Sequence, residues 1–207
     1  DIQFVHQSEI RNLTSNICIQ VGAGVLIADL LNFCAERGLS GLEWAGGLPG
    51  TVGGAIRGNA GAFGGEIKDS IAEVTSLTLA EPKLILRKKE DCRFDYRNSI
   101  FKKQPNEIVI GAVLQLQPGD PKIIRQLTDD KINYRHQKHP MDYPNIGSIF
   151  KNVDWSDLCR TSTIIGELKK ELEKKVKNDP HPVLPTAVLI DRCGLRGVVC
   201  GGAMISP

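Results

Sequence analysis

Residues 47–65 read GLPGTVGGAIRGNAGAFGG, and this stretch determines how the rest of the chain is interpreted. Ten of the 25 residues 41–65 are glycine, which costs chain entropy on folding unless a turn or a close neighbour requires it. We therefore predict neither an ordinary helix nor a disordered linker. Two interpretations are open: backbone N–H groups that cradle a diphosphate or face a flat ring, or tight turns packed against one another.

The spacing of the glycines does not decide between these interpretations, because it matches neither GxGxxG nor GxxxxGK[ST].

The sequence on either side of the glycine-rich segment predicts regular helices and strands. Apolar residues recur every three or four positions over residues 25–35, and Gly38 follows as a stop signal, so a helix is predicted there. A second helix is predicted from Pro121 to about Arg135. Strands are predicted at residues 17–21, 71–79, 84–86 and 107–117, the second and third being paired.

The composition and pattern of the sequence change after residue 138. Residues 139–144 (HPMDYP) are typical of a linker. A short strand at residues 148–150, a charged helix at residues 165–176 and a proline-rich joint at residues 179–182 are predicted beyond it. We therefore predict one domain over residues 1–138 and a second over residues 139–207.

Composition excludes several classes of protein. The 207 residues are 41% hydrophobic, and 26 basic and 24 acidic residues are spread along the chain without the basic block of a nucleic-acid-binding protein. No apolar run reaches the roughly 20 residues of a membrane span, so we expect a soluble protein. The six cysteines form no CxxC pair and are expected to be buried free thiols in the cytoplasm. The four histidines lack metal-binding spacing, and no metal is predicted.

Four motifs, in order along the chain, resemble the UDP-N-acetylenolpyruvoylglucosamine reductase (MurB) family. They are GLEWAGGLPGTVGGAIRGNAGAFGGEI at residues 41–67, FDYRNSIF at residues 94–101, GSIFKN at residues 147–152 and LIDRCGLRG at residues 189–197. The second resembles the family's YRxSxF element and the third its GSxFKN element. Four ordered motifs are far more specific than one glycine-rich loop.

The resemblance implies an α+β fold. It implies an FAD-binding domain of the vanillyl-alcohol-oxidase/PCMH type over residues 1–138, then an incomplete MurB-type α/β substrate domain over residues 139–207. An N-terminal FAD subdomain is expected before residue 1, and a segment with a catalytic glutamate after Pro207. The residues expected to contact FAD are Gly47, Leu48, Pro49, Gly50, Thr51, Val52, Gly53, Gly54, Asn59, Ala60, Gly61 and Gly64.

The activity that the resemblance implies is the reduction of UDP-N-acetylglucosamine enolpyruvate to UDP-N-acetylmuramate in the cytoplasm. Hydride passes from NADPH through FAD to the enolpyruvyl ether. This reaction makes a peptidoglycan precursor, so the protein is expected to serve cell-wall biogenesis, cell shape and cell division. The expected partner is a small UDP-sugar, with no nucleic acid and no membrane, and the oligomeric state is left open.

The resemblance also assigns roles to individual residues. Arg97 is expected to stabilise the carboxylate of an enolate-like intermediate, a task that suits its planar charged fork. Ser148 is expected to donate a proton, with Ile149 and Phe150 helping to exclude water. The expected substrate contacts are Tyr96, Lys138, Lys151, Asn152 and Arg192. Arg192 stands where the resemblance suggests a glutamine.

Two other interpretations remain open. The first is a different FAD-dependent oxidoreductase on the same fold, such as an alcohol or sugar oxidase. Such enzymes usually hold FAD through histidine or cysteine near the glycine loop, and no histidine occurs between His6 and His136. The second is an inactive or non-catalytic fragment that retains the fold.

Overall fold

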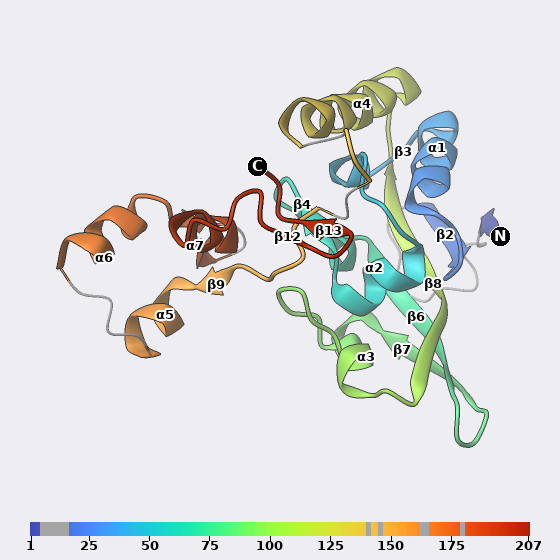
Figure 1. Ribbon diagram of the computed structural model, residues 1–207. Helices are drawn as coiled ribbons and strands as arrows, with labels where there is room; N and C mark the ends of the chain where they lie inside the picture. Colours follow the sequence, from blue (N-terminus) through green and yellow to red (C-terminus); the bar gives the residue numbers. More distant parts are fainter. Residues whose placement is uncertain (5–16, 140–141, 145–146, 162–165, 179–180) are drawn as a thin grey trace. The chain divides into compact units, whose positions relative to one another are not determined.

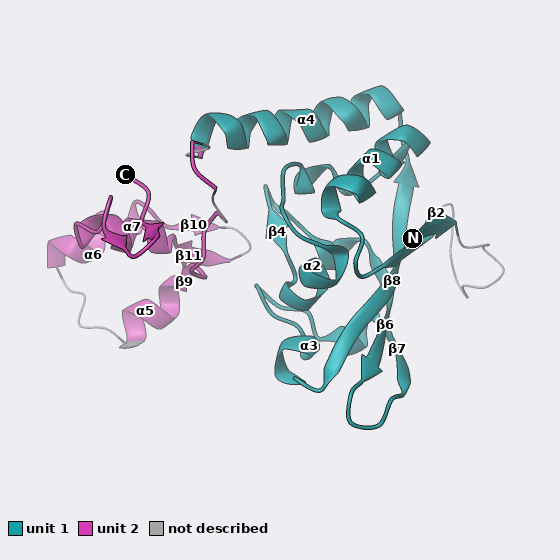
Figure 2. Cartoon of the chain, turned by 45° about the vertical axis from the view of Figure 1, so that its right-hand side comes forward, with its two compact units in different colours: residues 1–138 teal, residues 139–207 magenta. Residues whose placement is uncertain are grey.

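A computed structural model describes residues 1–4, 17–139, 142–144, 147–161, 166–178 and 181–207 (Figure 1). The chain divides into two compact units, Asp1–Lys138 and His139–Pro207 (Figure 2). Each unit is described by itself below. No helix in the described ranges has the length and apolar character needed to cross a membrane.

The first unit is built on an antiparallel sheet with the strand order β1-β2-β8-β6-β7. The central strand, β8 (Glu107–Pro118), pairs with β2, with β6 and with the short β3 (Leu39–Ser40). The other strands are β1 (Ile2–Phe4), β2 (Ile17–Gly22), β6 (Ile71–Thr78) and β7 (Leu84–Lys88).

Helices cover this sheet and join its strands. The first, α1 (Ile27–Arg37), ends at Gly38, whose φ of 65° is the left-handed conformation common at helix C-termini. It lies beside α4 (Pro121–Lys138) in both views (Figures 1 and 2). The core between sheet and helices contains, among others, Ile19, Val21, Leu30, Val52, Ile56, Val74, Leu114 and Leu116.

The glycine-rich segment forms short elements rather than one long one. These are η2 (Glu43–Ala45), α2 (Val52–Gly58), the hairpin β4 (Gly61–Ala62) with β5 (Gly65–Glu66), and η3 (Ile67–Asp69). The helix α2 packs against β2 and β8. Two further short elements of this unit are η4 (Lys89–Cys92) and α3 (Ile100–Lys103).

The second unit has a three-stranded antiparallel sheet with the order β10-β11-β9. Its buried side chains include Leu172, Val183 and Leu184. Its elements are β9 (Val153–Asp154), α5 (Trp155–Thr161), α6 (Gly166–Glu173), β10 (Lys177–Asn178), β11 (Pro182–Leu184), α7 (Thr186–Arg192), β12 (Val199–Cys200) and β13 (Ala203–Met204).

The predicted α+β class is confirmed, and the long elements agree with the sequence patterns. Two expectations were wrong. Residues 148–150 form no strand, and the strand of that region is β9, further along the chain. The glycine-rich segment contains a helix, α2, because Thr51 caps it by accepting a hydrogen bond from Gly54 N at 3.3 Å and three of its side chains are buried. The proline-rich joint at residues 179–182 lies partly outside the described residues, and its last residue begins β11.

The cysteines are less uniformly buried than expected. Cys18, Cys34 and Cys92 are buried, Cys159 is half-buried, and Cys193 and Cys200 are exposed. All six are free thiols. Burial raises the pKa of the Cys34 and Cys92 thiols to about 12. These two side chains therefore act as small apolar groups rather than nucleophiles at neutral pH.

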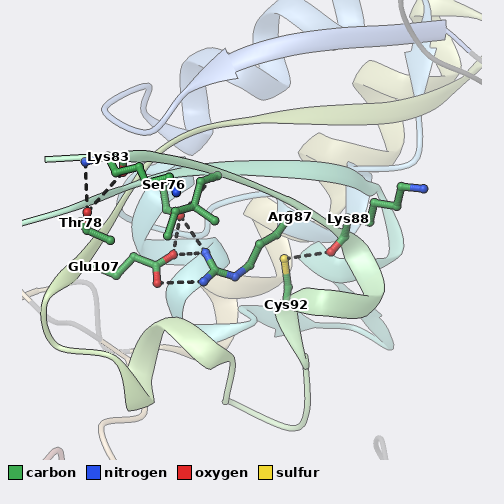
Figure 3. A network of polar contacts seen from close by, with 8 residues as sticks. Ser76, Thr78, Lys83, Arg87, Lys88, Cys92 and Glu107 are labelled. Carbon is green, nitrogen blue, oxygen red and sulfur yellow. Dashed lines mark hydrogen bonds and ion pairs between the residues drawn. The ribbon is translucent and has the colours of Figure 1, made fainter. Parts of the chain in front are cut away.

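A polar network crosses the buried face of the sheet where β6, β7 and β8 meet (Figure 3). The Arg87 guanidinium is bidentate to the Glu107 carboxylate, with Nη2 to Oε2 at 3.1 Å, and Nη1 donates to Ser76 Oγ at 3.0 Å. The Ser76 hydroxyl also donates to Glu107. The side chains of Arg87 and Glu107 are only 13% and 3% exposed, so each charge depends on the other.

We expect Glu107→Gln to lower the free energy of unfolding by about 3 kcal/mol, because it leaves the buried Arg87 charge without a carboxylate. The measurement is urea unfolding followed by circular dichroism. The control is the double variant Arg87→Met with Glu107→Gln, which removes both charges and should recover most of the loss. A double variant as unstable as the single one would contradict this coupling.

Candidate active site

Five glycines of the segment lie so close to other protein atoms that no side chain fits. A Cβ atom on Gly46 would lie 2.9 Å from Lys131 Cβ, and one on Gly47 would lie 2.8 Å from Arg135 Cδ, both on α4. A Cβ atom on Gly53 would lie 2.8 Å from Ala23 Cβ. Gly61 and Gly65 are equally crowded, by Glu66 and Arg97 and by Trp44 respectively. Protein packing therefore accounts for these five positions.

Three other glycines have open space where a side chain would be. No described atom lies within 4 Å of a Cβ built on Gly50, Gly58 or Gly64. Gly50 and Gly64 have φ angles of +108° and +81°, which residues with a side chain rarely adopt. At these three positions, therefore, the structure shows no atom of the described residues that would require a glycine by crowding.

The backbone N–H groups at the start of α2 already donate hydrogen bonds within the protein. Val52 N donates to Val25 O and Gly53 N to Ala23 O, both at 2.9 Å. Gly54 N donates to the Thr51 hydroxyl at 3.3 Å. An anion cradle cannot use N–H groups that are already paired, so the packed-turn interpretation applies to the start of α2. Packing among the described residues does not account for Gly50, Gly58 and Gly64, so ligand contact at these positions stays a prediction.

Arg97 lies across the β4–β5 hairpin. Its Nη2 donates to Gly61 O at 2.5 Å, its Nη1 lies 3.8 Å from Glu66 Oε1, and its guanidinium carbon lies 5.0 Å from the ring centroid of Tyr96. The backbone φ of Arg97 is +53°, in the left-handed region. Such a conformation persists only where neighbours fix it. The structure therefore brings the predicted catalytic Arg97 onto the predicted cofactor segment.

A buried asparagine fixes the turn that carries Arg97. Asn59 is fully buried, and its side-chain amide donates to Asp95 O at 3.0 Å and accepts from Lys68 N at 3.3 Å. Asp95 and Asn98 exchange two backbone hydrogen bonds of 3.0 Å around Arg97. Asn59 was predicted to contact FAD, and the structure gives its side chain a role in joining three backbone segments.

An aromatic and cationic cluster at the tip of the same hairpin was not anticipated from the sequence. Phe63 is 40% exposed and has a φ of +52°. Lys131 Nζ lies 5.1 Å and the Arg135 guanidinium carbon 5.3 Å from its ring centroid, and the Tyr134 ring meets it edge-on. Arg135 Nε also donates to Gly46 O at 2.8 Å. Because α4 reads as a polar surface helix, nothing in its sequence indicates these contacts.

The other predicted site residues belong to the end of α4 and to the second unit. Lys138 is the exposed last residue of α4. In the second unit Ser148 is exposed, and Ile149 and Phe150 are 71% and 61% exposed. Ser148, Ile149 and Phe150 are thus all exposed within the described chain, and the role of Ile149 and Phe150 in excluding water stays a prediction.

Local contacts hold two of the predicted substrate residues in the second unit. Asn152 Oδ1 accepts a hydrogen bond from Thr186 N at 3.3 Å, and Lys151 O accepts one from the Thr186 hydroxyl at 2.7 Å. Arg192 forms an ion pair with Glu171. Together these contacts place residues 151–152 at the start of α7. Among the described residues, no group of three or more His, Cys, Asp or Glu side chains is arranged to hold a metal ion.

The arrangement in the first unit suits recognition of a planar anion beside a flat ligand. A guanidinium has five N–H donors in a fixed plane, and the bond to Gly61 O uses only part of that set. The Arg97 side chain is 36% exposed, so it reaches solvent beside the hairpin that includes Gly64. Carboxylates and phosphates are the groups that such a fork binds best.

Two family models match the chain. The model described as "FAD binding domain" matches residues 3–85, which contain the glycine-rich segment. The model described as "UDP-N-acetylenolpyruvoylglucosamine reductase, C-terminal domain" matches residues 139–207, which is the whole second unit. The order of the two matches agrees with the fold that the sequence motifs implied.

Curated relatives and a solved structure carry the same name. The UDP-N-acetylenolpyruvoylglucosamine reductase of Geobacillus kaustophilus is 39% identical over 150 residues, which are 72% of this chain and 48% of the relative. That of Fervidobacterium nodosum is 34% identical over 188 residues, 91% of this chain and 52% of the relative. The crystal structure of the Thermus caldophilus reductase superimposes with a TM-score of 0.63 at 29% identity, over 90% of this chain and 57% of that one. The chain therefore spans about half the length of the curated relatives it matches.

Two glycines of α2 offer a direct test of which positions the protein itself requires. We expect Gly53→Ala to lower the free energy of unfolding by about 1–2 kcal/mol, because the new methyl group overpacks against Ala23. In the same helix, Gly58→Ala meets open space and should leave stability unchanged or raise it by up to about 1 kcal/mol. Urea unfolding of both variants is the measurement, and equal effects would contradict the distinction.

Proposed function

Because the chain belongs to the UDP-N-acetylenolpyruvoylglucosamine reductase (MurB) family, we propose that it takes part in the NADPH-dependent, FAD-mediated reduction of UDP-N-acetylglucosamine enolpyruvate to UDP-N-acetylmuramate. Unit 1 carries the predicted FAD contacts, and unit 2 carries three of the predicted contacts to the UDP-sugar, Lys151, Asn152 and Arg192. The reaction supplies a precursor of peptidoglycan and takes place in the cytoplasm, where NADPH and nucleotide sugars are available.

The observation that carries this proposal is the bond from Arg97 to Gly61 O. It joins two motifs 36 positions apart, the YRNSIF element and the glycine-rich segment. An arginine in a strained backbone conformation, hydrogen-bonded to the backbone of a glycine loop, is suited to a reaction that builds up negative charge beside a flat cofactor.

Three glycines of the segment leave room for a cofactor. Gly50, Gly58 and Gly64 have open space where a side chain would otherwise stand, so the backbone at these positions would help to hold FAD. The other predicted contacts, among them Leu48, Pro49, Ala60 and Gly61, shape the same loop. When bound, FAD supplies hydride transfer from NADPH to the substrate.

Side chains of the protein stabilise the negative charge of the intermediate and supply the proton. Hydride reaches one carbon of the enolpyruvyl double bond, and negative charge then spreads over the neighbouring carbon and the carboxylate. Arg97 holds that carboxylate in its forked donors and stabilises the charge. The Ser148 hydroxyl gives its proton to the neighbouring carbon, which completes the reduction. Tyr96, Lys138, Lys151, Asn152 and Arg192 orient the UDP-sugar.

The proposal is tested with the protein produced from its complete gene, by measuring its flavin content and the two half-reactions. We expect a yellow protein whose flavin is reduced by NADPH and reoxidised by UDP-N-acetylglucosamine enolpyruvate. Arg97→Lys should slow reoxidation about 10²-fold, since lysine keeps the charge but loses the fork, while FAD content stays near normal. The matched control is Arg93→Lys, an exposed arginine that also has a positive φ.

Different results would lead to other conclusions. A protein that purifies without flavin and takes up none in a titration would contradict the proposal and favour a non-catalytic protein. A flavin that alcohols or simple sugars reduce, but that the UDP-sugar does not reoxidise, would favour another oxidoreductase on this fold. Equal losses of FAD content and rate in Arg97→Lys would assign Arg97 to cofactor binding.

Ser148→Ala separates the two half-reactions. The flavin should still be reduced by NADPH at a near-normal rate, because the glycine segment is untouched. Reoxidation by the UDP-sugar should slow by about 10²- to 10⁴-fold, the range expected for a lost general acid. Rapid-mixing absorbance measures both steps, with Ser156→Ala, another exposed serine of the second unit, as control. Reoxidation within a few-fold of the parent rate would show that Ser148 is not the proton donor.

A further inference from the structure

Glu66 is a buried acidic residue beside Arg97. The residue is 7% exposed, and its Oε1 atom is shielded from solvent without accepting a hydrogen bond from any described residue. Arg97 Nη1 lies 3.8 Å from this oxygen. A buried carboxylate oxygen without a donor is costly, so the guanidinium is attracted toward it. The attraction acts on the same side chain that the proposed reaction uses.

The position of Glu66 does not depend on Arg97. Its side chain accepts a hydrogen bond from the Asp69 backbone N–H, and Asp69 Oδ2 accepts one from Glu66 N at 2.9 Å. This reciprocal capping box fixes the start of η3. Lys68 forms an ion pair with the other carboxylate oxygen, Oε2. Glu66 is therefore an anchored charge, and Arg97 is the half-exposed partner that it can orient.

Gly61 allows the two side chains to meet. A Cβ atom on Gly61 would lie 2.8 Å from Glu66 Cγ and 3.0 Å from Arg97 Nη1, so both side chains pass directly over its backbone. Gly61 O accepts from Arg97 Nη2, while Glu66 faces Nη1. One nitrogen end of the guanidinium is thus hydrogen-bonded to the hairpin, and the other faces a carboxylate oxygen of the same hairpin at ion-pair distance.

We propose that Glu66 is a positioning residue for Arg97: together with Gly61 O, its buried carboxylate holds the guanidinium in one orientation across the β4–β5 hairpin. A free arginine side chain loses rotamer entropy on binding. Restricting the guanidinium in advance removes part of that loss from the step in which it binds the substrate carboxylate. This second part rests on the proposed function, whereas the restraint itself does not.

The restraint can be measured without cofactor or substrate. In FAD-free protein labelled with ¹⁵N-arginine, the Nη–H signals of Arg97 are identified by their loss in Arg97→Lys. We expect solvent exchange of these protons to be about tenfold faster in Glu66→Gln, a change within the range of couplings between contacting residues. Glutamine keeps the size of the side chain and an oxygen for the capping box. Unchanged exchange in a folded variant would overturn the proposal.

A double-mutant cycle tests the effect on the reaction. In the FAD-loaded protein, Glu66→Gln should slow reoxidation by the UDP-sugar about tenfold and leave reduction by NADPH within about twofold. In an Arg97→Ala background, the same change should have less than about a twofold effect, because Glu66 acts through Arg97. Equal slowing in both backgrounds would indicate a purely structural role and overturn the proposal.

Two further variants make the result decisive. Lys68→Met removes the other cation partner of Glu66 and should leave both the exchange and the reoxidation rate near the parent values. Glu66→Asp keeps a charge and a good capping group but draws the carboxylate back from Arg97. It should make solvent exchange about threefold faster and reoxidation about threefold slower. This variant tests the proposal even if the glutamine variant does not fold. If the UDP-sugar does not reoxidise the parent flavin, the proposed function fails, while the exchange measurement still tests the restraint.

Discussion

The first unit depends on backbone contact at five glycines. At Gly46, Gly47, Gly53, Gly61 and Gly65, other parts of the protein lie closer than a Cβ atom permits. Through these contacts α4 packs on the turn after η2, the loop after β2 packs on α2, and Arg97 crosses the hairpin. The packed-turn interpretation therefore applies to these five positions. No described atom fills the place of a side chain at Gly50, Gly58 and Gly64, where ligand contact stays a prediction.

The sequence predicted the elements whose patterns are long and regular. The alternation in β6 and β8, the helical period of α1 and the proline at the start of α4 are local signals that tertiary contacts reinforce. Prediction from the sequence failed at short elements. Residues 148–150 are apolar yet form no strand, and α2 contains three glycines yet forms a helix, because its cap and its buried face outweigh weak propensity.

The site was only partly accessible to sequence reasoning. Arg97 and the glycine loop were predicted as site residues through resemblance to a family, and the structure brings them into contact. Glu66 was part of the same motif but gave no separate signal, since a lone glutamate is typical of an exposed surface. Only the fold shows that it is buried beside Arg97. Asn59 is a similar case, because a buried amide with two backbone partners cannot be distinguished in sequence from a ligand-binding one.

The pairing of Arg97 with a buried carboxylate has a consequence for selectivity. A guanidinium whose charge is partly offset by Glu66 attracts any passing anion less strongly than an isolated one would. Its rigid fork still binds well to a carboxylate in the matching plane. The interaction of such a guanidinium with its ligand strengthens most when negative charge increases at a fixed place, as in the transition state of a reduction beside a carboxylate. In the proposed reaction, Arg97 would thus bind the transition state more strongly than the ground state, which is the condition for binding energy to increase the rate rather than only the affinity.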